Sequence, residues 1–237
     1  MDHETEEKLR ENFRQKTWSE IKSNDSWALF KIMGEIVHGF ESMAKIGPCV
    51  SIFGSARTQE NNPYYSQGIE IAKLLTQNGF GVITGGGPGI MEAANKGAKL
   101  GGGKSVGLSI NLPFEASSNA YVDKDYNISF DYFFTRKLMF IKYAQGFVVL
   151  PGGLGTLDEL FEALTLIQTK KIAKFPIVLV GKDYWAGLLD WMKKSMLEDQ
   201  KNINLEDFSL FHLVDTPKQA VEIIVNFYKE FNLQENF

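Results

Sequence analysis

The chain has 237 residues, of which 44% are hydrophobic and 13% aromatic, a composition typical of a globular protein with a buried core. Its 25 basic and 29 acidic side chains give a net charge of −4, which argues against a general nucleic-acid binder, because such proteins carry an excess of Lys and Arg. The single cysteine, Cys49, excludes an intramolecular disulfide, and the three histidines are too scattered for a zinc motif. We therefore expect neither a metal nor a cofactor.

The N-terminal residues are charged rather than apolar, and no stretch reaches the ~18 apolar residues that span a bilayer. We expect a cytoplasmic protein without a membrane partner. Residues 1–45 are predicted to form an N-terminal helical arm, because apolar side chains recur there at three- and four-residue steps. This apolar stripe consists of Trp27, Phe30, Met33, Val37 and Phe40. It must be buried, either on the chain's own domain or on a partner subunit.

In residues 46–237, short apolar strands alternate with helical patterns. The predicted elements are strand 50–53, helix 64–77, strand 81–84, helix 90–100, strand 105–110, helix 132–144, strand 147–150, helix 157–169, strand 176–180, and helices 185–197 and 218–231. Pro113, Ser117, Ser118 and Asn119 mark a loop between residues 110 and 132. The alternation predicts an α/β fold, a doubly wound, Rossmann-like parallel sheet with helices on both faces. In such sheets ligands bind beyond the carboxyl ends of the strands.

The segment 151–159, PGGLGTLDE, is the most informative in the chain, because it follows a buried-strand pattern and continues into a helix. Its glycines let the main chain turn tightly and expose N–H groups, and Thr156 is expected to cap the helix. Unpaired amides and the positive end of the helix dipole attract an anion. The segment therefore predicts a phosphate-binding loop beside two carboxylates, Asp158 and Glu159.

Three other glycine-rich loops are less specific. Residues 54–57, GSAR, end the first strand and allow close approach of a ligand, with Arg57 either on a phosphate or in solvent. Residues 85–91, GGGPGIM, are interpreted as a ligand-facing loop but not as a dinucleotide fingerprint, because Ile90 occupies the sixth position and no ribose-binding acid follows. Residues 101–105, GGGKS, lead from a helix into a strand, the reverse of a P-loop, and are expected to end that helix.

Three segments together, GGGPGIMEAAN (85–95), FFTRKLMF (133–140) and PGGLGTLDE, closely resemble the Lonely Guy (LOG) family of Rossmann-like nucleoside 5′-monophosphate phosphoribohydrolases. The resemblance extends over residues 48–230. It implies hydrolysis of the N-glycosidic bond of AMP or of cytokinin riboside 5′-monophosphates, which releases the free base and ribose 5-phosphate. It also implies a homodimer or higher homo-oligomer with sites near the interface. Members have carried the label lysine decarboxylase, for which this sequence offers no supporting chemistry.

The resemblance implies two catalytic residues, Arg136 and Glu159. The family often reads PGGxGTxEE, whereas position 158 is Asp here, one methylene shorter. The glycine loops and the resemblance together give a set of substrate-binding residues. They are Gly54, Ser55, Gly86, Gly87, Glu115, Lys137, Gly152, Gly153, Leu154, Gly155, Thr156, Leu157, Asp158 and Thr165.

Breaking a ribosyl C–N bond builds positive charge on the sugar, so a carboxylate facing the anomeric carbon stabilises the transition state. Glu159 is the candidate for this role and for accepting a proton from the attacking water. Arg136 is expected to orient Glu159 and to keep it ionised, because an adjacent cation lowers the pKa of a carboxyl group. From composition alone, Arg136 and Glu159 would be surface charges; their motif context favours the site.

Two other functions compete with the hydrolase. A noncatalytic nucleotide-binding carrier or sensor would keep the phosphate-binding loop but would not need Glu159. A nicotinamide-dependent oxidoreductase is disfavoured by the broken dinucleotide fingerprint. The sequence leaves open the preferred base and the choice between an inverting and a covalent route.

Overall fold

The computed structural model describes residues 18–111 and 118–237. This part of the chain divides into two compact units, one ending at His38 and the other beginning at Gly39. The sequence places its division a little later, after residue 45. Residues 1–17 of the predicted arm, and Glu115 among the predicted site residues, lie outside the described residues.

The first unit consists of helix α2 (Trp18–Met43) as far as His38. Most of the predicted apolar stripe is exposed there: Trp27 is 69% exposed and Phe30 64%, and their rings meet edge to face with centroids 6.2 Å apart. Met33 and Val37 are also more than half exposed. The described residues confirm a helix over residues 18–43, and of the five side chains in the stripe only Phe40 is partly buried, where it packs against the core of the second unit.

The second unit is built on a seven-stranded sheet in which every neighbouring pair is parallel, in the order β4-β3-β2-β1-β5-β6-β7. The strands are β1 (Cys49–Phe53), β2 (Gly81–Thr84), β3 (Ser105–Ile110), β4 (Asn127–Phe130), β5 (Ala144–Val149), β6 (Ile177–Val180) and β7 (His212–Val214). The chain adds β2 to β4 on one side of β1 and β5 to β7 on the other. The winding thus reverses between β1 and β5, where doubly wound sheets bind ligands.

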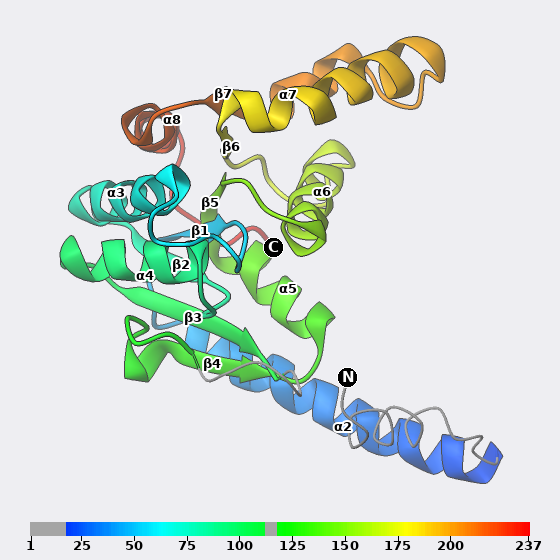
Figure 1. The fold of residues 1–237 in the computed structure, drawn as a ribbon. Helices are drawn as coiled ribbons and strands as arrows, with labels where there is room; N and C mark the ends of the chain where they lie inside the picture. Colours follow the sequence, from blue (N-terminus) through cyan, green and yellow to red (C-terminus); the bar gives the residue numbers. More distant parts are fainter. Residues whose placement is uncertain (1–17, 112–117) are drawn as a thin grey trace, which may run out of the picture. The chain divides into compact units, whose positions relative to one another are not determined.

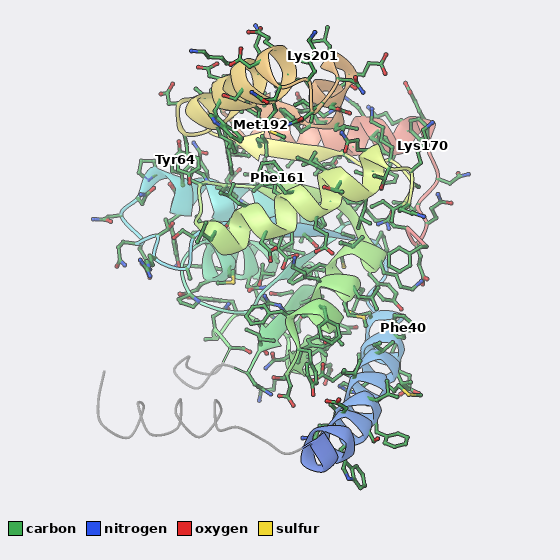
Figure 2. The ribbon with its side chains drawn as sticks, turned by 90° about the vertical axis from the view of Figure 1, so that its right-hand side faces the viewer. Phe40, Tyr64, Phe161, Lys170, Met192 and Lys201 are labelled. Atoms are coloured by element: carbon green, nitrogen blue, oxygen red, sulfur yellow. The ribbon has the colours of Figure 1, made fainter. Side chains whose placement is uncertain are left out.

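Helices cover both faces of this sheet, α3, α4 and α8 on one side and α5 and α6 on the other (Figure 1). Figure 2 shows the second face, with Phe161 labelled on α6. The helices after α2 are α3 (Pro63–Gln77), α4 (Ile90–Leu100), α5 (Phe133–Tyr143), α6 (Leu154–Gln168), α7 (Lys182–Trp191) and α8 (Pro217–Glu230), with the 3-10 turns η1 (Lys124–Tyr126) and η3 (Leu205–Leu210) and a π-helical segment η2 (Met192–Asp199). The doubly wound prediction is confirmed.

Local sequence explains where the helices begin and why the strands are central. The Asn62 side chain accepts a hydrogen bond from the backbone N–H of Tyr64 at 2.9 Å, and Pro63 opens α3. Thr216 and Gln219 form a capping box at α8. All residues of β1, β2, β5 and β6 are buried, as expected of parallel strands covered on both faces.

Two strands were missed in the sequence. The segment after residue 110, interpreted as irregular, contains β4, whose Ile128 and Phe130 are buried while Asn127 and Ser129 are exposed. Strand β7 has only three residues. Both lie at the edges of the sheet, where short strands contribute few apolar residues and leave a weak pattern.

Candidate functional site

A cavity of ≈ 660 Å³ opens at the carboxyl ends of β1, β2, β3 and β5. Its volume is in the range of small-molecule sites. The cavity lies where the strand order reverses, which is the position that the doubly wound fold predicts for a ligand.

Most of the predicted site residues line this cavity. They are Gly54, Ser55, Gly86, Gly87, Arg136, Gly153, Leu154, Gly155, Thr156 and Glu159. They come from loops after three different strands and from α5 and α6. The fold therefore brings together residues that are as much as 105 positions apart, Gly54 and Glu159.

Other predicted site residues do not line the cavity of the single chain. Gly152 immediately precedes in sequence the lining residue Gly153, and the side chain of Leu157 packs against the core. Thr165 is exposed on α6, where its hydroxyl donates to the carbonyl oxygen of Phe161 at 2.7 Å. Lys137 and Asp158 form an ion pair with each other, with 2.8 Å between Nζ and Oδ1.

Backbone hydrogen bonds hold the loops after β1, β2 and β5 together. The N–H of Ser55 donates to the carbonyl oxygen of Pro151 at 3.0 Å, and the carbonyl oxygen of Ser55 accepts from the N–H of Ile90 at 3.0 Å. Gly89 has a positive φ of 68°, and a Cβ there would collide with the carbonyl oxygen of Ser55. The GSAR loop is therefore fixed between the two other glycine loops.

The predicted phosphate-binding loop differs in one respect from the sequence prediction. Helix α6 begins at Leu154, three residues earlier than expected, with Gly153 as its N-cap. Thr156 therefore lies inside the first turn and is buried, and the expectation that it caps the helix is wrong. The N–H of Thr156 donates to the carbonyl oxygen of Gly153 at 3.0 Å, whereas the N–H groups of Leu154 and Gly155, which line the cavity, have no backbone acceptor among the described residues. The helix terminus thus still offers an anion site, without a side-chain cap.

Arg136 and Glu159 face each other across the wall of the cavity. Nη2 of Arg136 lies 4.0 Å from Oε1 of Glu159, and both side chains are largely buried. The guanidinium also lies over the ring of Phe133, 5.0 Å from its centroid, and 5.8 Å from that of Phe140. Among the described residues, Oε2 of Glu159 has no hydrogen-bond partner. This buried oxygen is available to a substrate hydroxyl or a water molecule.

Glu159 does not have the low pKa that the sequence led us to expect. Burial raises its pKa from 4.5 to about 7, because the residue is only 4% exposed; Arg136 and Lys137 oppose the change but do not cancel it. Arg136 thus lowers the pKa of Glu159 as expected, but this effect is smaller than the increase caused by burial. A carboxyl group with a pKa near neutrality is suited to exchange a proton during a reaction.

Lys137 joins α5 to α6 beside this pair. Its Nζ lies 2.8 Å from Oδ1 of Asp158 and 2.8 Å from Oε2 of Glu162. Burial lowers the pKa of Lys137, but the two carboxylates outweigh this effect and raise it. Lys137 is therefore charged, and it contributes positive potential at Glu159 without lining the cavity.

A polar network behind the second glycine loop was not recognised in the sequence. The Asn119 amide donates to the carbonyl oxygens of Gly86 and Gly87, at 3.0 and 2.9 Å, and to Oδ1 of Asn95 at 2.9 Å. Asn95 is fully buried and accepts from the Thr84 hydroxyl at 2.6 Å. The Thr84 hydroxyl in turn accepts from the N–H of Gly86 at 2.9 Å. This network fixes the backbone of the glycine loop that lines the cavity.

Replacing Asn119 with Ala is expected to lower the free energy of unfolding by about 1–3 kcal/mol, because the half-buried carbonyl oxygen of Gly87 loses its side-chain donor, while that of Gly86 keeps only the backbone N–H of residue 119. Urea unfolding followed by circular dichroism measures this change. Asn226→Ala is the matched control, since Asn226 is exposed on α8 and accepts only from Lys229 among the described residues. Equal effects of the two substitutions would contradict the role of the network.

The cavity also contains side chains that the sequence analysis did not assign. Arg57 and Met91 belong to glycine loops that the sequence places at the ligand-binding edge, whereas Ser109, Ile110 and Phe133 are not assigned there as ligand contacts. Ser109 and Ile110 end β3, so the rule that ligands bind at the carboxyl ends of strands would have identified them. Met91, Ile110 and Phe133 contribute apolar side chains to the wall.

Residues 18–111 and 118–237 contain no cluster of three or more His, Cys, Asp and Glu side chains arranged to bind a metal ion. Across the same ranges, no helix has both the length and the apolar character required to cross a membrane. The GGGKS segment ends α4 as expected, with Gly101 as the C-cap, and Lys104 donates to the carbonyl oxygens of Lys45 and Ile46.

Comparison with known proteins identifies relatives of this chain. A family model described as "Possible lysine decarboxylase" matches residues 91–224, more than half of the chain. A cytokinin riboside 5′-monophosphate phosphoribohydrolase of Mycobacterium tuberculosis is 35% identical over 127 residues, which cover 52% of this chain and 66% of that protein. A probable enzyme of the same name from Oryza sativa subsp. japonica is 29% identical over 153 residues, which cover 63% of this chain and 61% of the relative. The chain thus spans less than two thirds of the length of both relatives.

Solved structures with the same fold are more distant in sequence. The molybdenum cofactor carrier protein of Chlamydomonas reinhardtii is 23% identical, with a TM-score of 0.53 over 77% of this chain and 99% of that one. The molybdenum cofactor binding protein of Rippkaea orientalis is 22% identical, also with a TM-score of 0.53, over 76% of this chain and 96% of the other. These similarities show that the doubly wound fold is shared.

Proposed function

Because the chain belongs to the Lonely Guy family, we propose that it hydrolyses the N-glycosidic bond of AMP or of a cytokinin riboside 5′-monophosphate, releasing the free base and ribose 5-phosphate. The observation that carries the proposal is the position of Glu159. Its carboxyl group lines the cavity, 4.0 Å from Arg136, on the helix whose N-terminus forms the phosphate-binding loop. The relatives named as phosphoribohydrolases support the same class of reaction.

The spacing on α6 suits a nucleotide. Leu154 and Glu159 are five residues apart, which corresponds to roughly 8 Å along a helix axis. A phosphate held at the first turn therefore leaves room for a ribose before the carboxyl group. The less polar wall formed by Met91, Ile110 and Phe133 is then available to the base.

In the proposed mechanism, positive charge develops on the ribose as the C–N bond breaks, and the Glu159 carboxylate stabilises it. As the C–N bond breaks, the oxygen of a water molecule bonds to the anomeric carbon and one proton of that water passes to Glu159. The departing base nitrogen takes one proton from solvent, and Glu159 later releases its proton to solvent, so one water is consumed and the proton count balances. Arg136 orients Glu159 and the ribose hydroxyls. A guanidinium hardly deprotonates, so we assign it no proton transfer.

The proposal is tested by incubating the purified protein with a panel of nucleoside 5′-monophosphates and the matching nucleosides, and by measuring the released base by chromatography. We expect release from purine monophosphates and a strong preference for them over the nucleosides. Equal turnover of both classes would contradict the phosphate-binding role of residues 153–156. The base released fastest identifies the preferred substrate.

A noncatalytic nucleotide carrier is the alternative. The molybdenum cofactor carrier protein has this fold, but at 23% identity the likeness extends to the fold alone. A carrier does not need a buried carboxyl group with a raised pKa in its binding cavity, and the presence of Glu159 therefore favours the enzyme. Tight AMP binding by the wild type without any base release would favour the carrier.

We further propose that the chain acts in the cytoplasm as a homodimer or higher homo-oligomer, with a purine nucleoside monophosphate as substrate and with no nucleic-acid or membrane partner. The family resemblance supports the assembly. The exposed apolar side chains of Trp27, Phe30, Met33 and Val37 are consistent with it. Light scattering on the purified protein tests the assembly, and a mass equal to one chain would contradict it.

A further inference from the structure

Arg57 is a cation in the cavity to which the proposed reaction assigns no role. It follows β1, the central strand, in the loop Gly54-Ser55-Ala56-Arg57, and it lines the same cavity as the first turn of α6. Strands β1 and β5 are hydrogen-bonded neighbours, so their carboxyl ends emerge side by side. The loop that carries Arg57 therefore lies next to the loop that precedes α6.

The backbone around Arg57 is held in place on both sides. Ser55 is hydrogen-bonded to Pro151 and to Ile90, as described above. The N–H of Arg57 donates to the hydroxyl of Ser55 at 3.1 Å, and its carbonyl oxygen accepts from the Gln59 amide at 3.2 Å. These bonds fix the main chain and leave the guanidinium exposed.

The charges of the cavity wall do not balance. Among the described residues that line it, the charged ones are Arg57, Arg136 and Glu159. Arg136 is paired with Glu159, whereas within residues 18–111 and 118–237 no ion pair or side-chain hydrogen bond involves the Arg57 guanidinium. The wall therefore carries a positive charge that an anionic ligand would complement.

The helix terminus alone is too weak to neutralise a phosphate. A phosphate monoester carries about 1.5 to 2 negative charges at pH 7, whereas a helix N-terminus supplies roughly half of one positive charge. A guanidinium supplies a full charge and can donate two parallel hydrogen bonds to phosphate oxygens. Among the described cations that line the cavity, Arg57 is the one without a carboxylate partner.

We propose that Arg57 is a specificity-determining residue, which binds the 5′-phosphate of the substrate together with the N-terminus of α6. Arg57 thereby selects nucleoside monophosphates over nucleosides. The inference rests on the proposed function for the identity of the ligand. Its test, however, measures binding and does not require turnover.

The experiment compares the affinities of the wild type, Arg57→Ala and Arg57→Lys for AMP, ribose 5-phosphate and adenosine by isothermal titration calorimetry. We expect Arg57→Ala to bind AMP and ribose 5-phosphate about tenfold more weakly, since one charged contact is lost. Arg57→Lys should recover part of the affinity, and adenosine should bind equally to all three proteins. The AMP affinity of Arg57→Ala should also depend less on salt concentration.

Lys218→Ala is the matched control, because Lys218 is a largely exposed cation on α8, outside the cavity. It should bind AMP as the wild type does. Wild-type AMP affinity in Arg57→Ala, or an equal loss of adenosine affinity, would overturn the inference. If the wild type binds AMP but releases no base, the proposed hydrolysis fails, while the comparison of binding affinities still decides the role of Arg57.

Discussion

Glu159→Gln is expected to lower the rate of base release from AMP by about 1,000-fold or more, while AMP still binds. The substitution keeps the size of the side chain but removes both the negative charge that stabilises the ribosyl cation and the proton acceptor. Both functions act in the transition state, so the loss should appear in kcat with little change in affinity. Single-turnover release of base and calorimetric binding of AMP measure the two quantities separately.

Glu162→Gln controls for the loss of a carboxylate from the same helix. Glu162 lies three residues after Glu159 on α6 and pairs with Lys137, but it does not line the cavity. We expect the Glu162→Gln variant to release base at least 100-fold faster than the Glu159→Gln variant. Comparable losses in the two variants, or a Glu159→Gln variant as active as the wild type, would contradict the assignment of Glu159.

The loops that form the cavity could be predicted because their signals are local. Glycines directly after apolar strands mark the carboxyl edge of a parallel sheet, and that edge is where Gly54, Gly86 and Gly153 meet. The motif context that placed Arg136 and Glu159 near helix starts also brought them to one wall, 4.0 Å apart. Strand ends and helix starts can be located from the sequence to within a few residues, which is sufficient to predict which loops form the cavity.

Features that depend on packing could not be predicted in this way. The pKa of Glu159 is set by how deeply α5 and α6 bury its carboxyl group, and neither motif contains that information. The ion pair between Lys137 and Asp158 depends on how α5 packs against α6, and the sequence did not predict it. Asn119 lies in a segment without periodicity, so its contact with a loop 33 residues earlier left no signal.

The raised pKa of Glu159 predicts how activity depends on pH. If Glu159 must be ionised to act, log kcat/KM for AMP should rise with a slope of one below pH 7 and level off above it, because the free protein's carboxyl group titrates near 7.

Arg136 lowers the pKa of Glu159, so Arg136→Gln should move the rising part of the pH profile to higher pH. Lys137→Met should move it by less in the same direction. Base release measured between pH 4.5 and 9 gives the limb for each variant. A wild-type limb near pH 4.5, or a shift to lower pH in Arg136→Gln, would contradict burial as the dominant effect.

Folding stability reports the same pKa without turnover. Between pH 4.5 and 7 the folded protein keeps a proton on Glu159 that the unfolded chain has lost, so this group makes stability fall as pH rises through that interval and contributes no further change above it. Glu159→Gln lacks this contribution. The free energy of unfolding of the variant minus that of the wild type should therefore increase by on the order of 3 kcal/mol from pH 4.5 to pH 8. Urea unfolding at several pH values measures the difference. A constant difference would mean that Glu159 has an ordinary pKa, and the carboxyl group would then be mostly ionised over most of this interval.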